Sequence, residues 1–167
     1  MLPQGVVING LEFASRQGKL AGRLRLDTLP RLTGMLFEAS GHLDYEVAGE
    51  TAGEAAFLAL KLNGTLPLTC QRCLGALDYA LSVRNRVMLV GSGSPWPEDD
   101  QVGGLEDEAC DAIEGSRDLD LVPLLEEEIL LALPIAPRHE HCDPPRATAI
   151  ARELSPFAQL AKLKRNQ

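Results

Sequence analysis

The sequence predicts an α+β fold, in which an antiparallel β-meander is covered by one main helix at about residues 121–133, with short N-terminal and C-terminal helices. Two observations predict it. Consecutive segments in the first half alternate between apolar and polar residues and are separated by short glycine-containing turns, which is typical of neighbouring antiparallel strands. A leucine-rich segment with helical periodicity follows later in the chain. Such a meander can stay open or take a barrel-like form.

Four segments have the alternation expected of half-buried strands. They are residues 19–26, 41–48, 56–62 and 77–90. In the first segment the leucines point to one side and Arg23 and Arg25 point to the other, so this strand has a basic outer face. Either a solvated surface or a contact with RNA accounts for that basic face.

The main helix is expected to begin after Asp120, whose carboxylate can cap it, and to end before Pro134. Its apolar residues form one broad stripe and its last turn is apolar almost all round, so the helix must be buried against a sheet or a partner. Glu128 lies beside this stripe. We expect Glu128 to flank the stripe rather than to be buried, because acidic residues are seldom fully buried.

The two shorter helices are expected near the ends of the chain. Asn9 and Glu12 have the spacing of a capping box, which predicts a short helix starting after Asn9. Ser155 followed by Pro156 marks a helix start within a C-terminal extension at 143–167. The basic residues of this extension that are candidates for RNA contact are Lys162, Lys164 and Arg165.

A chain of 167 residues favours one domain that spans 1–167. Aromatic residues make up only 4% of it, so aliphatic side chains must fill the core. No segment is long and apolar enough to cross a membrane, and the first residues lack the features of a secretion signal. We therefore expect a cytoplasmic protein with no membrane contact, whose cysteines are reduced unless they bind metal.

The charge of the chain is unevenly distributed. The net charge is −8, and residues 92–142 alone carry 14 acidic and 2 basic side chains. Most of the surface should therefore repel nucleic acid, so any RNA contact requires a local basic patch or a second protein. The composition of residues 92–117 predicts a mobile acidic loop with a short strand near Ala112 and Ile113. In this loop Trp96 either docks on a partner or packs back on the sheet.

The cysteine spacing predicts half of a metal site. Cys70 and Cys73 form a C-x₂-C turn between two predicted strands, and such a turn can present two thiolates to one zinc ion. Cys142 together with His141, or with His139 in its place, would complete a Cys₃His zinc site. Two alternatives stay open: the cysteines are free structural thiols, or Cys70 and Cys73 act as a redox dithiol.

Catalytic motifs do not occur in the sequence. It has no phosphate-binding glycine loop, no G-x-S-x-G motif and no HExxH motif, and His42 is isolated. A non-enzymatic protein without a small-molecule substrate is therefore expected.

Several motifs occur in the order found in a known family: Cys70-Gln-Arg-Cys73, Asp118–Leu121, Glu126–Pro134 followed by Ile135–Pro137, His141-Cys142 and Pro156–Lys164. Together they resemble the bacterial YceD family over roughly the last two thirds of the chain, while the first 60 residues match only in general layout. The resemblance implies a single YceD-like domain in a non-enzymatic cytoplasmic protein. It also implies a role in the synthesis, processing or stability of large-subunit (23S) ribosomal RNA.

Two functions follow as hypotheses. In the first, the protein is a ribosome-biogenesis factor that acts as an adaptor for a ribosomal protein or for precursor ribosomal RNA. The acidic loop would then attract basic ribosomal proteins, while the arginine face and the basic tail would contact RNA. In the second, the protein is a zinc-stapled or thiol-responsive protein-binding module that is unrelated to the ribosome.

Overall fold

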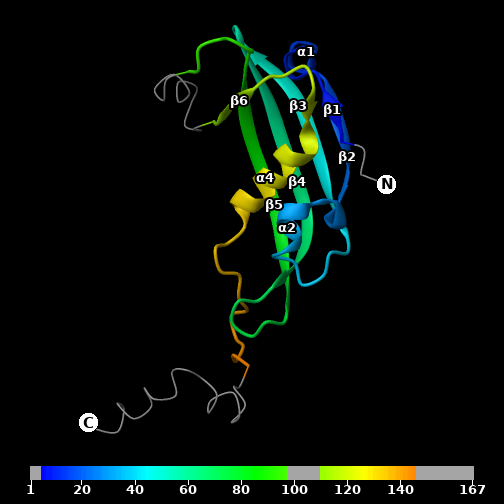
Figure 1. The fold of residues 1–167 in the computed structure, drawn as a ribbon, viewed down its shortest axis with the longest axis vertical. Coiled ribbons are helices and arrows are strands. Elements are labelled where there is room, and N and C mark those ends of the chain that lie inside the picture. The colour runs from blue at the N-terminus through cyan, green and yellow to red at the C-terminus, as the bar shows by residue number, and fades with distance from the viewer. Residues whose placement is uncertain (1–4, 98–109, 146–167) are drawn as a thin grey trace, which may run out of the picture.

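The computed structural model describes residues 5–97 and 110–145, which form an open five-stranded sheet with helices packed on one face (Figure 1). The order in the sheet is β2-β3-β4-β5-β6. The strands are β2 (Lys19–Arg25), β3 (His42–Ala52), β4 (Ala55–Thr69), β5 (Ala76–Val90) and β6 (Ala112–Glu114). The first four form an antiparallel meander, and β6 pairs parallel to β5. The predicted α+β meander is confirmed.

The described residues form no closed barrel, so the barrel-like alternative for the meander is wrong. Strands β2 and β6 are the two edges of the sheet and do not pair with each other. Strand β6 lies within residues 92–117, has only three residues, and pairs with β5 in the parallel direction. A barrel requires hydrogen bonds between the first and last strands, and this sheet does not form them.

Strands β3 and β4 extend beyond the predicted ranges 41–48 and 56–62, whereas β5 matches the predicted 77–90 to within one residue. The pattern ended the second of these strands at residue 62, yet β4 continues through Asn63 and Gly64 to Thr69. Gly64 pairs with Leu43 on one side and Leu81 on the other. A Cβ atom at Gly64 would lie 2.6 Å from the Leu43 side chain, so the glycine lets a core leucine approach the backbone closely instead of ending the strand.

Helix α4 (Leu121–Ala132) covers the sheet as predicted. The Asp120 carboxylate accepts a hydrogen bond from Val122 N at 3.0 Å, and the helix ends at Ala132, with Leu133 as its C-cap directly before Pro134. Leu121, Leu125 and Ile129 form its buried stripe, at 0–1% exposure. They pack against leucines of β3, β4 and β5, which point to the same side of the sheet.

Two shorter helices lie on the same face as α4 (Figure 1). Helix α1 (Gly10–Ser15) is capped by Asn9, whose side chain accepts from Glu12 N, so the predicted N-terminal helix is confirmed. Helix α2 (Pro30–Thr33) follows a 3₁₀ turn, η1 (Leu26–Thr28). The C-terminal helix predicted after Ser155 lies outside the described residues.

Two carboxylates of α4 are buried, so the expectation that Glu128 only flanks the stripe is wrong. Glu128 is 6% exposed, and it accepts a hydrogen bond of 2.7 Å from Asn85 Nδ2 on β5. Glu126 is 3% exposed and accepts from the backbone N–H groups of Arg31 and Leu32 at 2.8 and 3.0 Å. Helix α2 has no side-chain cap of its own, so the Glu126 carboxylate caps it from α4.

A second, two-stranded sheet was not predicted. Strand β1 (Val7–Ile8) pairs antiparallel with β7 (Leu119–Asp120), which leads directly into α4. In the 92–117 loop, the short strand expected near Ala112 is confirmed as β6, and Trp96 is 60% exposed. Among the described residues, no helix has the length and hydropathy needed to span a bilayer.

Candidate metal centre

The turn between β4 and β5 holds Cys70 and Cys73 in a fixed conformation. Cys70 N donates to Gly75 O and Leu74 N donates to Cys70 O, both at 2.9 Å. Leu74 has a φ of +61°, a left-handed conformation that lets the chain reverse directly after Cys73. Cys70 is buried and Cys73 is half-buried.

Residues 134–142, which we call the strap, run from the end of α4 back to this turn (Figure 1). Gln71 N donates to Pro137 O at 2.8 Å, and an Arg72 guanidinium nitrogen lies 3.4 Å from Cys142 O. These two contacts place the end of the strap against the C-x₂-C turn. The predicted return of Cys142 to the dithiol is therefore present in the structure.

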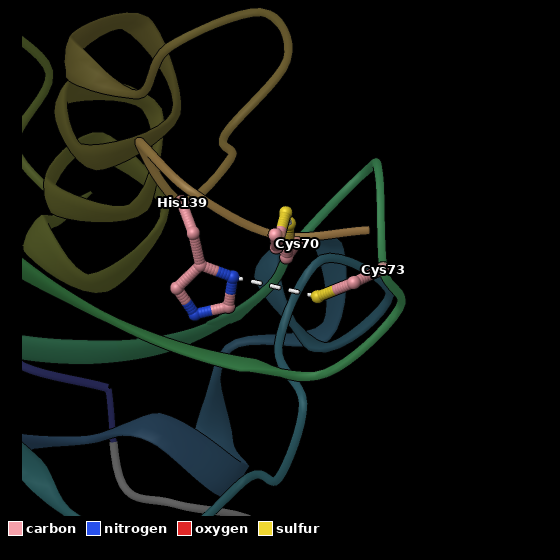
Figure 2. Close-up of side chains that lie close together, drawn as sticks. Cys70, Cys73 and His139 are labelled. Atoms are coloured by element: carbon pink, nitrogen blue, oxygen red, sulfur yellow. Dashed lines mark hydrogen bonds between the residues drawn. The ribbon is translucent and has the colours of Figure 1, made fainter. Parts of the chain in front are cut away.

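Four side chains converge where the strap meets the turn: Cys70, Cys73, His139 and Cys142, with ligand atoms within 4.8 Å of one another. The Cys70 and Cys142 sulfurs are 3.8 Å apart, and Cys73 Sγ lies 3.4 Å from His139 Nδ1. Figure 2 shows the His139 ring pointing toward the Cys73 sulfur.

The Cys70–Cys142 and Cys73–His139 distances match those of a tetrahedral zinc site. With Zn–S bonds of about 2.3 Å and Zn–N bonds of about 2.0 Å, two sulfurs lie about 3.8 Å apart, and a sulfur and a nitrogen about 3.5 Å apart. The Cys₃His donor set is one that structural zinc sites use, and four protein ligands leave no open position for a substrate or a reactive water. The four residues therefore fit a structural zinc site in which protein ligands fill every coordination position.

The second nitrogen of the His139 ring supports this assignment. His139 Nε2 lies 2.9 Å from Ala76 O, the first carbonyl of β5, so Nε2 carries the proton and donates it to that oxygen. The lone pair of Nδ1 then faces the sulfurs. Histidine ligands of metals usually donate their other N–H to a carbonyl or carboxylate in this way, which fixes the tautomer and the ring orientation.

His141, which the sequence favoured as the fourth ligand, does not belong to the cluster. The strap bends at Glu140 and His141, and His141 is exposed. Because of this bend, the residues that face the turn are three positions apart, His139 and Cys142. No local pattern distinguishes the two histidines, because the decisive contact is made with Ala76 O, far away in the sequence.

The electrostatics of the cluster favour a thiolate at Cys70. Hydrogen bonds from the backbone of Cys73, and then of Arg72 and His139, lower the pKa of the Cys70 thiol to about 5, against the opposing effect of desolvation. Desolvation first, and then the neighbouring Cys70 and Cys73 sulfurs, raise the pKa of Cys142. Since metals bind thiolates, Cys70 is ready to bind zinc at neutral pH, whereas Cys142 must release a proton as the metal enters.

The other candidate residues do not join this cluster. On β2, Arg23 pairs with Asp44 at 3.4 Å, and Arg25 pairs with Asp27, whose pKa it lowers through a side-chain hydrogen bond. Cys110 is buried just before β6 and lies outside the four-residue cluster. The basic residues of the C-terminal extension lie outside the described part of the chain: Lys162, Lys164 and Arg165.

A protein-family model matches the part of the chain that contains the metal cluster. The model of the family described as "Large ribosomal RNA subunit accumulation protein YceD" matches residues 58–164. This range includes most of β4, all of β5 and α4, and the four residues of the metal cluster. No solved structure matches the chain. Since the match covers more than half of the sequence, the chain belongs to the YceD family, a family linked to large-subunit ribosomal RNA accumulation and not known for enzyme activity.

Proposed function

We propose that this protein is a non-enzymatic ribosome-biogenesis factor needed for the synthesis, processing or stability of large-subunit (23S) ribosomal RNA. It acts as an adaptor that binds a ribosomal protein or precursor ribosomal RNA. The observation that carries the proposal is the YceD match over residues 58–164, because it includes the main helix and the metal cluster that organise the molecule.

The metal cluster has a structural part in this proposal. Zinc bound to the three sulfurs and to His139 Nδ1 would cross-link the strap to the β4–β5 turn. The strap continues directly from α4, so this link would fix the C-terminal side of the helix relative to the sheet. Because all four positions are filled by protein ligands, the site supports binding through a stable surface and supplies no reaction.

The charge distribution suggests two contact regions. The acidic residues gather in 92–142, where a basic ribosomal protein would be attracted. The basic residues proposed to contact RNA are Arg23, Arg25, Lys162, Lys164 and Arg165. An adaptor of this kind would hold a ribosomal protein on its acidic side and precursor RNA on its basic side.

Depletion in growing cells tests this proposal directly. We expect the ratio of 23S to 16S ribosomal RNA to fall on depletion and large-subunit precursor particles to be lost from sucrose gradients. The protein should co-sediment with those particles and crosslink to their RNA or protein. An unchanged ratio, with the protein absent from every precursor fraction, would contradict the proposed function.

The second candidate function is a zinc-stapled or thiol-responsive protein-binding module with no link to the ribosome. The short distance between the Cys70 and Cys142 sulfurs favours a response to oxidation, because metal release would leave two thiols close together. Crosslinking before and after mild oxidation separates the two functions. Non-ribosomal protein partners that change with oxidation would support the module, whereas oxidation-independent ribosomal partners would exclude it.

A further inference from the structure

One face of the five-stranded sheet carries none of the described helices (Figure 1). The apolar residues that alternate along β2 to β5, such as Val47, Leu60 and Val83, point toward the helices and are buried. The residues between them therefore point to the opposite side. We call this side the open face, and it includes Lys19, Ala21, Arg23, Arg25, Asp44, Glu46, Ala48, Glu50, Ala59, Lys61, Asp78, Ala80, Arg84 and Arg86.

The open face is basic in a protein that is acidic as a whole. The residues of β2 to β5 on this face include six basic and four acidic side chains. Glu114 of β6 adds a fifth acid at the edge of the face, because it pairs in register with Val90, while the net charge of the chain is −8. Three of the acids lie in salt bridges with bases of the same face, Asp44 with Arg23, Glu46 with Lys61 and Glu50 with Arg86. The fourth, Asp78, lies at the far end of β5, where it pairs in register with Pro67.

Two cations of this face are free to meet a ligand. Lys19 and Arg84 are exposed, and within the described part of the chain neither has a salt-bridge partner. They lie on different strands, β2 and β5, so they stand on opposite sides of the open face. A ligand that crosses the strands can therefore reach both charges.

A hollow of about 540 Å³ lies in this face over β2, β3 and β4. Its walls include Lys19, Lys61 and the carboxylates of Glu46 and Glu50. Its floor is formed by three short side chains, which leave a depression between their longer neighbours. They are Ala21, Ala48 and Ala59, and Ala48 pairs in register with Ala59 on the next strand.

Arg86 lies beside the hollow, because it pairs in register with Ala59. Its guanidinium carbon is 3.9 Å from the centre of the Phe57 ring, and Glu50 holds it from the side at 3.1 Å. The guanidinium therefore lies over the Phe57 ring, with the Glu50 carboxylate beside it. Arginine planes of this kind stack well on nucleobases, and the Arg86 side chain keeps 32% of its surface exposed.

We propose that the open face binds a single-stranded segment of large-subunit ribosomal RNA, an inference that rests on the proposed function. Lys19 and Arg84 contact phosphates, and a nucleobase enters the hollow over the alanines, next to Arg86. The carboxylates of Glu46 and Glu50 are acceptors for the amino groups of that base. A single strand fits better than a duplex, because only an unpaired base can leave its neighbours and enter a hollow.

A protein partner fits this face less well. Ribosomal proteins are the other candidate partner, and a basic surface on such a protein would be repelled by the excess cations of the open face. The same protein would be attracted to the acidic residues of 92–142, which carry 14 acidic and 2 basic side chains. The charge of the chain therefore assigns RNA to the open face.

An RNA-binding assay tests whether Lys19 and Arg84 contact phosphates. It uses the full-length, zinc-loaded protein and a labelled single-stranded RNA of about 12 nucleotides. Fluorescence anisotropy is measured over a range of salt concentrations. We expect Lys19→Glu and Arg84→Glu each to weaken binding about tenfold and to reduce the salt slope by about 0.7, the value for one phosphate of a single strand. Arg117→Glu makes the same charge change at an exposed site outside the open face and should have a much smaller effect.

The hollow is tested without changing any charge. Ala59→Leu fills the depression and should weaken RNA binding several-fold, whereas Ala80→Leu places the same side chain on the same face outside the hollow and should not. Thermal unfolding of each variant shows that the fold is retained. If Ala59→Leu or Arg84→Glu unfolds, it is replaced by Ala59→Val or Arg84→Gln, which alters the same position more mildly.

The outcomes separate this inference from the proposed function. Wild-type affinity in the open-face variants, or equal losses in Arg117→Glu, would overturn the inference. So would an absence of RNA binding with crosslinks to ribosomal protein alone, even if depletion still lowers 23S ribosomal RNA. In contrast, RNA binding that depends on the open face, combined with unchanged 23S levels on depletion, would support the inference and contradict the proposed function.

Discussion

Helix α4 and the strap that follows it are consecutive in sequence, but different forces hold them in place. The helix buries Leu121, Leu125 and Ile129 almost completely, and its carboxylates bond to α2 and β5. In the strap only Pro137 is buried, and Ile135 is fully exposed. Its contacts are a backbone hydrogen bond to Gln71, the carbonyl contact of Arg72 and the side chains of the metal cluster.

The difference shows where, among the described residues, a bound metal would contribute most to stability. Apolar burial stabilises the helix by itself, at roughly 25 cal/mol for each Å² removed from water. The strap has too little apolar surface against the sheet to be held in the same way. Four converging ligand atoms can replace a hydrophobic interface, because bound metal contributes its binding free energy to the folded state.

The largest loss of stability should come from a substitution in the buried stripe of α4. Leu125→Ala removes a side chain that is 1% exposed, so we expect it to lower the free energy of unfolding by about 2–5 kcal/mol. Leu131→Ala changes the same residue type where it is 68% exposed and should cost no more than about 0.5 kcal/mol. Urea unfolding measures both. Equal losses would contradict the assignment of the buried stripe.

The second-largest loss of stability should come from removing the buried carboxylate of Glu126. Glu126→Ala leaves the N–H groups of Arg31 and Leu32 without their acceptor, so we expect a loss of about 1–3 kcal/mol. Glu127→Ala removes only the exposed ion pair with Arg31 and should cost less than about 1 kcal/mol. If the two variants are equally stable in urea, the Glu126 carboxylate does not cap α2.

Replacing each strap histidine in turn by alanine tests which of the two is a zinc ligand. His139→Ala should lower zinc affinity at least tenfold, about 1.4 kcal/mol, because the loss of a ligand exceeds the loss of a supporting hydrogen bond. His141→Ala should leave zinc affinity unchanged, since His141 is exposed and outside the cluster. Competition with a chromogenic chelator measures both affinities. A loss in the His141 variant alone would reverse the assignment.

The last effect is the pH dependence of the metal-free protein. The folded state lowers the pKa of Cys70 to about 5, well below its ordinary value of 9.0. Between these pH values the unfolded state binds more protons, so stability should rise with pH from about 5 to about 9 and be lost as pH falls through about 5. Urea unfolding in chelator should show this slope. Cys70→Ser should flatten it, and an unchanged slope would exclude the thiolate.

Local signals in the sequence were enough to predict the main helix, its cap at Asp120 and the alternation of the strands. The pairings that depend on distant residues were not predictable in this way. Glu126 and Glu128 are buried because α2 and Asn85 supply donors, and β4 continues through Gly64 because Leu43 packs over it. The cysteine spacing indicated a metal site, but the choice of histidine depended on the bend of the strap.

The open face illustrates the same limit. The alternation in residues 19–26 placed Arg23 and Arg25 on an outer surface, and the structure agrees. However, both arginines are paired with acids, and the unpaired cations are Lys19 and Arg84 among the described residues of this face. Only the register of four strands brings those two residues, the alanine floor and Arg86 onto one surface.

The central claim is that metal ligation holds the strap on the β4–β5 turn, and zinc analysis combined with hydrogen exchange tests it most directly. Protein purified without chelator should contain one zinc ion per chain, and Cys142→Ser should lose it. Metal loss should speed amide exchange in the strap and at Gln71 while α4 stays protected. Metal-free protein with four titratable thiols, and a strap equally protected in chelator, would contradict the claim.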